Sequence, residues 1–139
     1  MMDIDDFKFF NDSFSHVKGD ECLCLIMSSV NNIISEESLR IYRYGGEEFL
    51  IIRPGDLDST IKLASQIRET VYKLKIDTPK DKSTHPFVST SIGINKIQID
   101  SHLNIESLIN GVDKSLYYSK EHGKNCCSYN EKIVDPSDK

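Results

Sequence analysis

The sequence predicts an α+β fold, an α/β sandwich in which helices cover a central sheet. Three observations support this prediction. Short β-type runs alternate with stretches whose apolar residues recur at helical spacing, and two of the β-type runs are separated by little more than Gly-Gly. The 38% hydrophobic and 28% charged content is that of a soluble globular protein, and 139 residues suffice for one domain with a sizeable core. The expected order is β-α-α-β-β-α-β-α-β.

The first half of the chain is expected to form a strand, two helices and a hairpin. Residues 1–4 read as the end of a strand, and residues 5–15 as a short helix. A longer helix is expected to open at Gly19-Asp20 and to close over residues 31–37, because apolar residues between them recur at helical spacing. The hairpin is expected over residues 39–52. The aromatic residues predicted to lie in the core are Phe7, Phe10, Phe14 and Tyr117.

The second half continues the alternation of helices and strands. Asp56 or Asp58 can cap a third helix, and the prolines and polar residues of 77–86 indicate a loop. Residues 87–94 read as a strand. Asn104 can cap a last helix that ends at Gly123. The chain is then expected to finish with a short strand over residues 126–129 and a frayed tail over residues 134–139.

Composition excludes several classes of function. With 22 acidic and 17 basic residues the net charge is −5, which argues against a nucleic-acid polymer or an anionic membrane as the main partner. No apolar run approaches the roughly 20 residues of a membrane span, and no signal peptide is visible, so a cytoplasmic location is expected. A zinc site is conceivable, but the usual Cys-x2-Cys spacing is absent and free thiols are the default. The cysteines are Cys22, Cys24, Cys126 and Cys127.

The stretch around Gly45-Gly46 concentrates the chemistry. Both glycines can take a positive φ at a hairpin turn, and without side chains they let a bulky ligand approach the backbone. Alternation along a strand would send Glu47 and Glu48 to opposite faces. Asp3 lies at the C-terminal end of the first strand, so Asp3 and Glu47 converge if that strand lies beside the hairpin. Two such carboxylates suit Mg²⁺, which prefers oxygen ligands and keeps other positions for water and phosphate.

Four separated blocks, residues 3–20, 43–49, 89–94 and 112–125, resemble in order the signatures of the GGDEF family, the diguanylate cyclases. The hairpin block is the GGEEF variant of the name-giving loop. The blocks cover almost the whole chain. The resemblance implies a ferredoxin-like fold with a nucleotidyl-cyclase palm-like, antiparallel central sheet. It places the domain at residues 1–133, followed by a disordered tail at 134–139.

The family condenses two GTP molecules into cyclic di-GMP with release of pyrophosphate, as a homodimer with one GTP per domain. The resemblance implies Mg²⁺, with Mn²⁺ as a possible substitute, held by Asp3, the Ile4 carbonyl and Glu47. It implies catalytic roles for Glu47, which would also help deprotonate the ribose 3′-hydroxyl, and for Glu48 and Lys8. The implied guanine-side residues are Asn11, Asp20 and, nearby, His16. The remaining implied substrate contacts are the backbone of Asp6 and Phe7, with Gly45, Gly46, Lys120 and Lys124.

Each of these residues also has a purely structural interpretation. Asp3 and Lys8 could be solvated residues, His16 could be a packed surface histidine, and Asn11 could serve only in a turn or cap. Lys120 and Lys124 could simply complement a helix dipole. The functional interpretation is favoured because the residues occur together. It also fits the chemistry, since a carboxylate and an amide match the N–H and O6 groups of guanine, and lysines match a triphosphate.

The sequence departs from the family pattern in three respects. The family's N-terminal helix and full first strand are absent before Asp3, so the domain looks truncated. Glu36 and Leu39 stand where many members carry the Arg-x-x-Asp motif of product inhibition. Lys124 replaces an arginine, and Ser15 a glycine. A catalytically inactive nucleotide-binding or regulatory module is therefore the alternative function, and another nucleotidyl cyclase or palm domain is a third. A sensory or regulatory domain is expected in the full-length parent.

Overall fold

The computed structural model describes residues 1–98, 104–134 and 136. Its five strands and four helices follow one another in the predicted order. Most of the predicted tail, residues 135 and 137–139, lies outside the described residues. The elements are β1 (Met2–Ile4), α1 (Phe7–Phe14), α2 (His16–Ile33), β2 (Arg40–Gly45), β3 (Glu48–Ile52), α3 (Leu57–Lys73), β4 (Thr90–Ile94), α4 (Ile105–Glu121) and β5 (Cys127–Tyr129).

The strands form one mixed sheet in the order β2-β3-β1-β4-β5. The short β1 lies in its centre, antiparallel to β3 and to β4. The prediction of an antiparallel sheet is wrong for the last pair, because β5 runs parallel to β4. Parallel neighbours need a long crossover, and α4 provides it. Because β1 is the central strand, the residues that follow it lie in the middle of the sheet, at the end where β1 stops.

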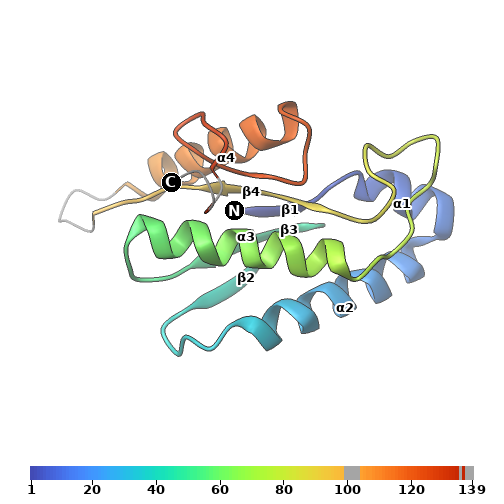
Figure 1. Cartoon of the computed structure of the whole chain (residues 1–139), viewed down its shortest axis with the longest axis horizontal. Helices are drawn as coiled ribbons and strands as arrows, with labels where there is room; N and C mark the ends of the chain where they lie inside the picture. Colours follow the sequence, from blue (N-terminus) through green and yellow to red (C-terminus); the bar gives the residue numbers. More distant parts are fainter. Residues whose placement is uncertain (99–103, 135, 137–139) are drawn as a thin grey trace.

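Helices cover both faces of the sheet. Figure 1 shows α4 on one side, α2 and α3 on the other, and α1 at one end. Successive residues of β1 point to opposite faces. Met2 and Ile4 join the larger core with Phe7, Ile26 and Ile67, whereas Met1 packs with Val112 and Leu116 of α4. Asp3 therefore points to the α4 side.

Two expected helix features are corrected by the structure. The helix α2 begins at His16 and not at Gly19-Asp20, because Ser15 caps it by accepting a hydrogen bond from the Lys18 N–H at 3.4 Å. Gly19 is therefore a buried residue inside the helix. Of the predicted core aromatics, Phe7 and Phe10 are buried, but Phe14 is 45% exposed and Tyr117 is 65% exposed.

The hairpin turn is shifted by one residue from its predicted place. Gly45 ends β2 opposite Glu48, and the turn itself consists of Gly46 and Glu47. Only Gly46 has a positive φ, 28°, so one of the two glycines supplies the freedom that was expected of both. Glu47 is thus a turn residue, and the alternation argued for Glu47 and Glu48 does not apply. The strand predicted over residues 87–94 is also shorter, because β4 begins at Thr90.

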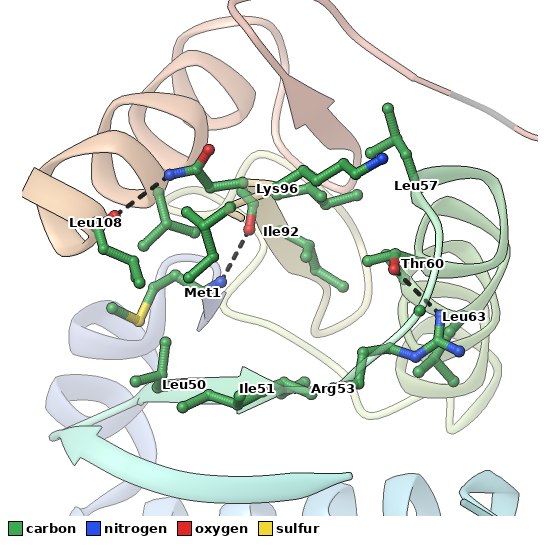
Figure 2. Close-up of a pocket in the computed structure, with 18 of the residues that line it drawn as sticks. Met1, Leu50, Ile51, Arg53, Leu57, Thr60, Leu63, Ile92, Lys96 and Leu108 are labelled. Atoms are coloured by element: carbon green, nitrogen blue, oxygen red, sulfur yellow. Dashed lines mark hydrogen bonds between the residues drawn. The ribbon is translucent and has the colours of Figure 1, made fainter. Parts of the chain in front are cut away.

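A largely apolar cavity of about 190 Å³ lies between α3 and α4, beside Met1 (Figure 2). Leu50, Ile92, Leu63 and Leu108 are among the residues that line it. None of the predicted site residues does, because the cavity lies at the Met1 end of β1 and the acidic residues follow its other end. Among the described helices, none is long and apolar enough to cross a membrane.

Candidate active site

The pairing of β1 with β3 brings Asp3 to the hairpin. The Cα of Asp3 lies opposite that of Glu48, and the Ile4 N–H donates to the Glu47 carbonyl at 3.3 Å. Asp3 is only 5% exposed, whereas Glu47 and Glu48 are half-buried. The Asp3 carboxylate of the central strand thus lies at the same end of the sheet as Glu47 and Glu48 of the hairpin, as predicted from the sequence.

Lys120 of α4 forms an ion pair with Asp3, with Nζ 2.8 Å from Oδ2. Burial raises the pKa of Asp3 to about 6, and the donating Lys120 ammonium only partly offsets this shift. Repulsion from the Glu47 and Asp5 carboxylates raises the pKa of Asp3 further. Glu47 is therefore close enough to Asp3 to be felt electrostatically, and this crowding of negative charge favours a bound cation.

The donor set fits a hard divalent cation. In the part of the chain that the structure describes, no three or more His, Cys, Asp or Glu side chains converge as a metal cluster. An ion at Asp3 and Glu47 would therefore complete its shell with a backbone carbonyl, water or phosphate oxygens. Mg²⁺ usually binds proteins in this manner. The Asp3 carbonyl accepts a hydrogen bond from Thr90 Oγ1 at 2.7 Å.

Asn11 of α1 contacts the first turns of α2. A Cβ built on Gly19 would come 1.8 Å from Asn11 Oδ1, so the amide of Asn11 occupies the space above that glycine. Asn11 Oδ1 is buried and has no hydrogen-bond partner among the residues that the structure describes. Such an orphaned acceptor costs free energy unless a ligand or water pairs with it. Asp20, next to Gly19, is exposed, as is His16.

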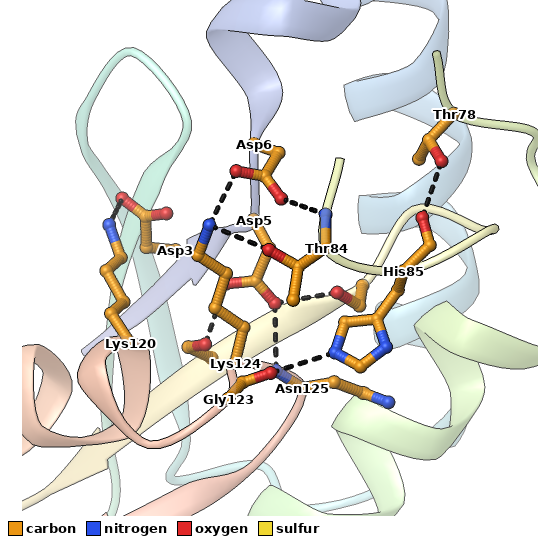
Figure 3. A network of polar contacts seen from close by, with 12 residues as sticks. Asp3, Asp5, Asp6, Thr78, Thr84, His85, Lys120, Gly123, Lys124 and Asn125 are labelled. Atoms are coloured by element: carbon orange, nitrogen blue, oxygen red, sulfur yellow. Dashed lines mark hydrogen bonds and ion pairs between the residues drawn. The ribbon is translucent and has the colours of Figure 1, made fainter. Parts of the chain in front are cut away.

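The start of α1 is tied to the turn after α4 (Figure 3). Lys124 Nζ lies 2.6 Å from Asp6 Oδ1, and the Thr84 N–H donates to Asp6 Oδ2 at 2.9 Å. Desolvation opposes the ionisation of Asp6, but these donors outweigh it and lower its pKa. Phe7 is buried, whereas Lys8 projects into solvent. The first N–H groups of a helix have no partner within the helix, so α1 presents donors beside Lys124.

Three residues of this region were not predicted from the sequence. The Asp5 carboxylate is buried and accepts hydrogen bonds from Ser89 Oγ and Ser91 Oγ, both at 2.7 Å. Thr84 and His85 come from the loop before β4 and contact the turn after α4. One signal could have revealed Asp5: Ser89 and Ser91 alternate in a predicted strand, so their hydroxyls share a face. No comparable signal exists for Thr84 and His85.

Comparison with known proteins gives a consistent answer. Residues 1–126 match the family model described as diguanylate cyclase, GGDEF domain. An uncharacterised membrane protein of Staphylococcus haemolyticus is 33% identical over 94% of the chain, and the diguanylate cyclase DgcM of Escherichia coli is 35% identical over 90%. The chain spans only 36% and 28% of the lengths of these two relatives.

Among solved structures, the active GGEEF domain of a diguanylate cyclase from Vibrio cholerae superposes with a TM-score of 0.75 at 30% identity. The match covers 91% of this chain and 78% of that domain. The shared fold is the mixed sheet with four helices described above. The motif blocks, the fold and the match over residues 1–126 agree, and the chain belongs to the GGDEF domain family of diguanylate cyclases.

Proposed function

We propose that this domain condenses two GTP molecules into cyclic di-GMP and releases pyrophosphate. The observation that carries the proposal is the meeting of Asp3 with the Glu47 turn at the edge of the central sheet. The ion pair between Lys120 and Asp3 adds a cation at the same place. The fold alone would not suffice, because one fold can host several functions.

The reaction joins the 3′-oxygen of one GTP to the α-phosphorus of the other. The 3′-hydroxyl loses its proton, and the bond from the α-phosphorus to the bridging oxygen of pyrophosphate breaks. A bound Mg²⁺ or Mn²⁺, held by Asp3, the Ile4 carbonyl and Glu47, would supply charge neutralisation for the phosphates and the attacking oxygen. Glu47, half-buried in the hairpin turn, is placed to accept the hydroxyl proton. Glu48 borders the same edge.

The remaining residues would bind and orient the nucleotide. Asn11 and Asp20 offer oxygen acceptors to the N–H groups of guanine, with exposed His16 nearby. Lys8, the first N–H groups of α1, and Lys124 would hold the terminal phosphates, and Lys120 would screen charge near Asp3. Gly45 and Gly46 leave room for the nucleotide at the hairpin, since a Cβ at Gly46 would meet no atom within 4 Å.

Each domain offers one such nucleotide site, so two domains must face each other for the two ribose hydroxyls to attack. We therefore propose a homodimer as the catalytic form. Because GTP is the substrate, we propose a cytoplasmic location for the domain. The relatives are about three times as long as this chain, and we propose that a sensory or regulatory domain controls it in the parent protein.

The proposal is tested by incubating the protein with GTP and Mg²⁺ and separating the products by chromatography. We expect cyclic di-GMP and two pyrophosphates per product molecule, with a specific rate that rises with protein concentration as dimers form. GTP binding without any turnover would instead identify the domain as a regulatory nucleotide-binding module. Turnover of ATP in place of GTP would identify a different nucleotidyl cyclase.

We predict that the domain binds GTP in preference to ATP. Adenine cannot donate to both acceptors at Asn11 and Asp20, and leaving the buried Asn11 Oδ1 unpaired costs about 1–3 kcal/mol. This corresponds to a loss of about tenfold or more in affinity. Calorimetry with the 3′-deoxy nucleotides, which cannot condense, measures both dissociation constants in the presence of Mg²⁺.

The matched variant for this prediction is Gly19→Ala. Alanine in a helix interior is favoured over glycine by about 1 kcal/mol, so the fold should survive. The new methyl group would nevertheless displace the Asn11 amide, whose Oδ1 lies 1.8 Å from the Cβ position. We expect Gly19→Ala to lose the preference for GTP. Equal binding of GTP and ATP by the unaltered protein would contradict the assignment of Asn11 and Asp20.

We predict that cyclic di-GMP does not inhibit the domain through the Arg-x-x-Asp position. Glu36, at the arginine position, makes two contacts with Arg53, at 2.8 and 3.0 Å, so it neutralises the nearby guanidinium. Leu39 is buried and offers no hydrogen bond to guanine. Titration with cyclic di-GMP by calorimetry checks this. Micromolar binding that disappears in a Glu36→Ala, Leu39→Ala double variant would show the prediction to be wrong.

A further inference from the structure

The turn that follows α4 has an unusual backbone. Its three consecutive residues, Gly123, Lys124 and Asn125, have φ values of 101°, 59° and 47°. We call these residues the Lys124 turn. A positive φ is disfavoured for lysine, and it persists only where surrounding contacts enforce it. The Lys124 N–H donates to the Ser119 carbonyl at 3.1 Å, at the end of α4, and the other contacts that hold the turn come from segments far away in the sequence.

Each residue of the Lys124 turn is held by a different partner (Figure 3). His85 Nε2 lies 2.9 Å from the Gly123 carbonyl oxygen, to which it donates as the Nε2–H tautomer. Lys124 Nζ donates to Thr84 Oγ1 at 3.1 Å as well as to Asp6. The Asn125 N–H donates to Asp5 Oδ2 at 3.1 Å. The turn is thus fixed on both sides of Lys124.

The partners are themselves immobilised. Asp5 is 5% exposed and accepts hydrogen bonds from Ser91 of β4 and from Ser89 just before it, so its carboxylate is a fixed acceptor beside the turn. Thr78 Oγ1 donates to the His85 carbonyl at 2.6 Å, and the His85 ring packs edge-on against Tyr72 of α3. The loop that carries His85 is therefore tied to the body of the domain.

We propose that His85, with Thr84 and Asp5, positions Lys124 for the triphosphate of the bound nucleotide. This inference rests on the proposed function. A lysine is a point charge on a flexible stem with four rotatable bonds, so its placement depends on where its backbone is held. The contacts of Gly123 with His85 and of Asn125 with Asp5 hold that backbone beside the first turn of α1, and the contact with Thr84 holds the Lys124 ammonium group. These contacts would lower the conformational entropy that Lys124 loses when phosphate binds, because its backbone is already held in place.

The test is a double-mutant cycle between His85→Ala and Lys124→Ala, read out as affinity. Calorimetry with Mg²⁺ gives dissociation constants for 3′-deoxy-GTP, which cannot condense, and for GMP, which lacks the terminal phosphates. If His85 acts through Lys124, His85→Ala weakens the binding of 3′-deoxy-GTP about three- to tenfold, as expected for one hydrogen bond. The same substitution leaves the affinity for GMP unchanged, and it causes no further loss of affinity for 3′-deoxy-GTP in the Lys124→Ala background.

Two further variants separate positioning from general damage. His85→Gln keeps an N–H donor and should restore most of the affinity for 3′-deoxy-GTP. His122→Ala removes a histidine of the same region. Among the described residues, its Nδ1 contacts the Tyr118 carbonyl of its own helix, so this substitution should leave the affinity unchanged. Circular dichroism of every variant checks that the fold is retained.

Two results would overturn the inference, and they are distinguishable. His85→Ala could weaken the binding of 3′-deoxy-GTP and of GMP equally, or it could cause its full loss of affinity again in the Lys124→Ala background. Either result would show that His85 does not act through Lys124. An unaltered protein that binds 3′-deoxy-GTP no better than GMP would overturn the triphosphate site itself. In that case the proposed function fails first, and the inference fails with it.

Discussion

Replacing Glu47 by glutamine should abolish the formation of cyclic di-GMP while the domain remains folded. Glu47 is a half-buried residue of the hairpin turn, outside the cores formed by the buried apolar residues. The substitution preserves size but removes one of the two carboxylates that would hold the metal and accept the hydroxyl proton. Loss of a catalytic base alone lowers rates about 10²–10⁴-fold. Chromatography of the products and urea unfolding measure the two effects separately.

The control for this prediction is Glu37→Gln. Glu37 is an exposed glutamate before the same hairpin, so its substitution removes the same charge without touching the site. We expect unchanged turnover for Glu37→Gln. Asp3→Asn should behave like Glu47→Gln, because it removes the other carboxylate and the partner of Lys120. A Glu47→Gln variant with unchanged turnover would place the metal elsewhere.

Substitution of Gly93 by alanine should destabilise the domain strongly, although it adds only one methyl group. A Cβ at Gly93 would lie 2.2 Å from the Leu116 backbone nitrogen and 2.6 Å from the Val112 carbonyl oxygen. These are backbone atoms of α4, so the clash is relieved only by moving the helix off the sheet. Overpacking of a well-packed core costs about 1–3 kcal/mol and occasionally more, and a displaced helix belongs to the upper end. Urea unfolding gives the free energy of unfolding directly.

A displaced α4 would also carry Lys120 and Lys124 away from their partners. Gly93→Ala should therefore lose nucleotide binding along with stability. Gly45→Ala is the matched control, since its Cβ would lie at an ordinary contact distance, 3.6 Å, from Glu48 Oε2. We expect Gly45→Ala to change the free energy of unfolding by about 1 kcal/mol or less. A Gly93→Ala variant as stable as the parent would show that α4 adjusts without cost.

Some features of the fold were predictable because they depend on neighbours in the sequence. Asp56 and Asn104 cap α3 and α4 as expected, each accepting a hydrogen bond from the N–H three residues later. The spacing of apolar residues identified the long helices, and Gly-Gly located the hairpin. The errors arose where local signals competed. Gly19 looked like the start of a helix, but Ser15 provides the cap, and helical spacing alone could not separate exposed Phe14 from buried Phe10.

The sequence by itself determined the family, the order of the elements and the motif residues, because these depend on patterns within a few residues. Only the tertiary structure decided which side chains meet. Lys124 and Asp6 are 118 positions apart, and Asn125 and Asp5 are 120 apart. Periodicity cannot reach over such separations, since it reports only which face of an element a residue occupies. The sheet order placed β1 between β3 and β4, and this brought Asp3 to the hairpin and Asp5 to the Lys124 turn.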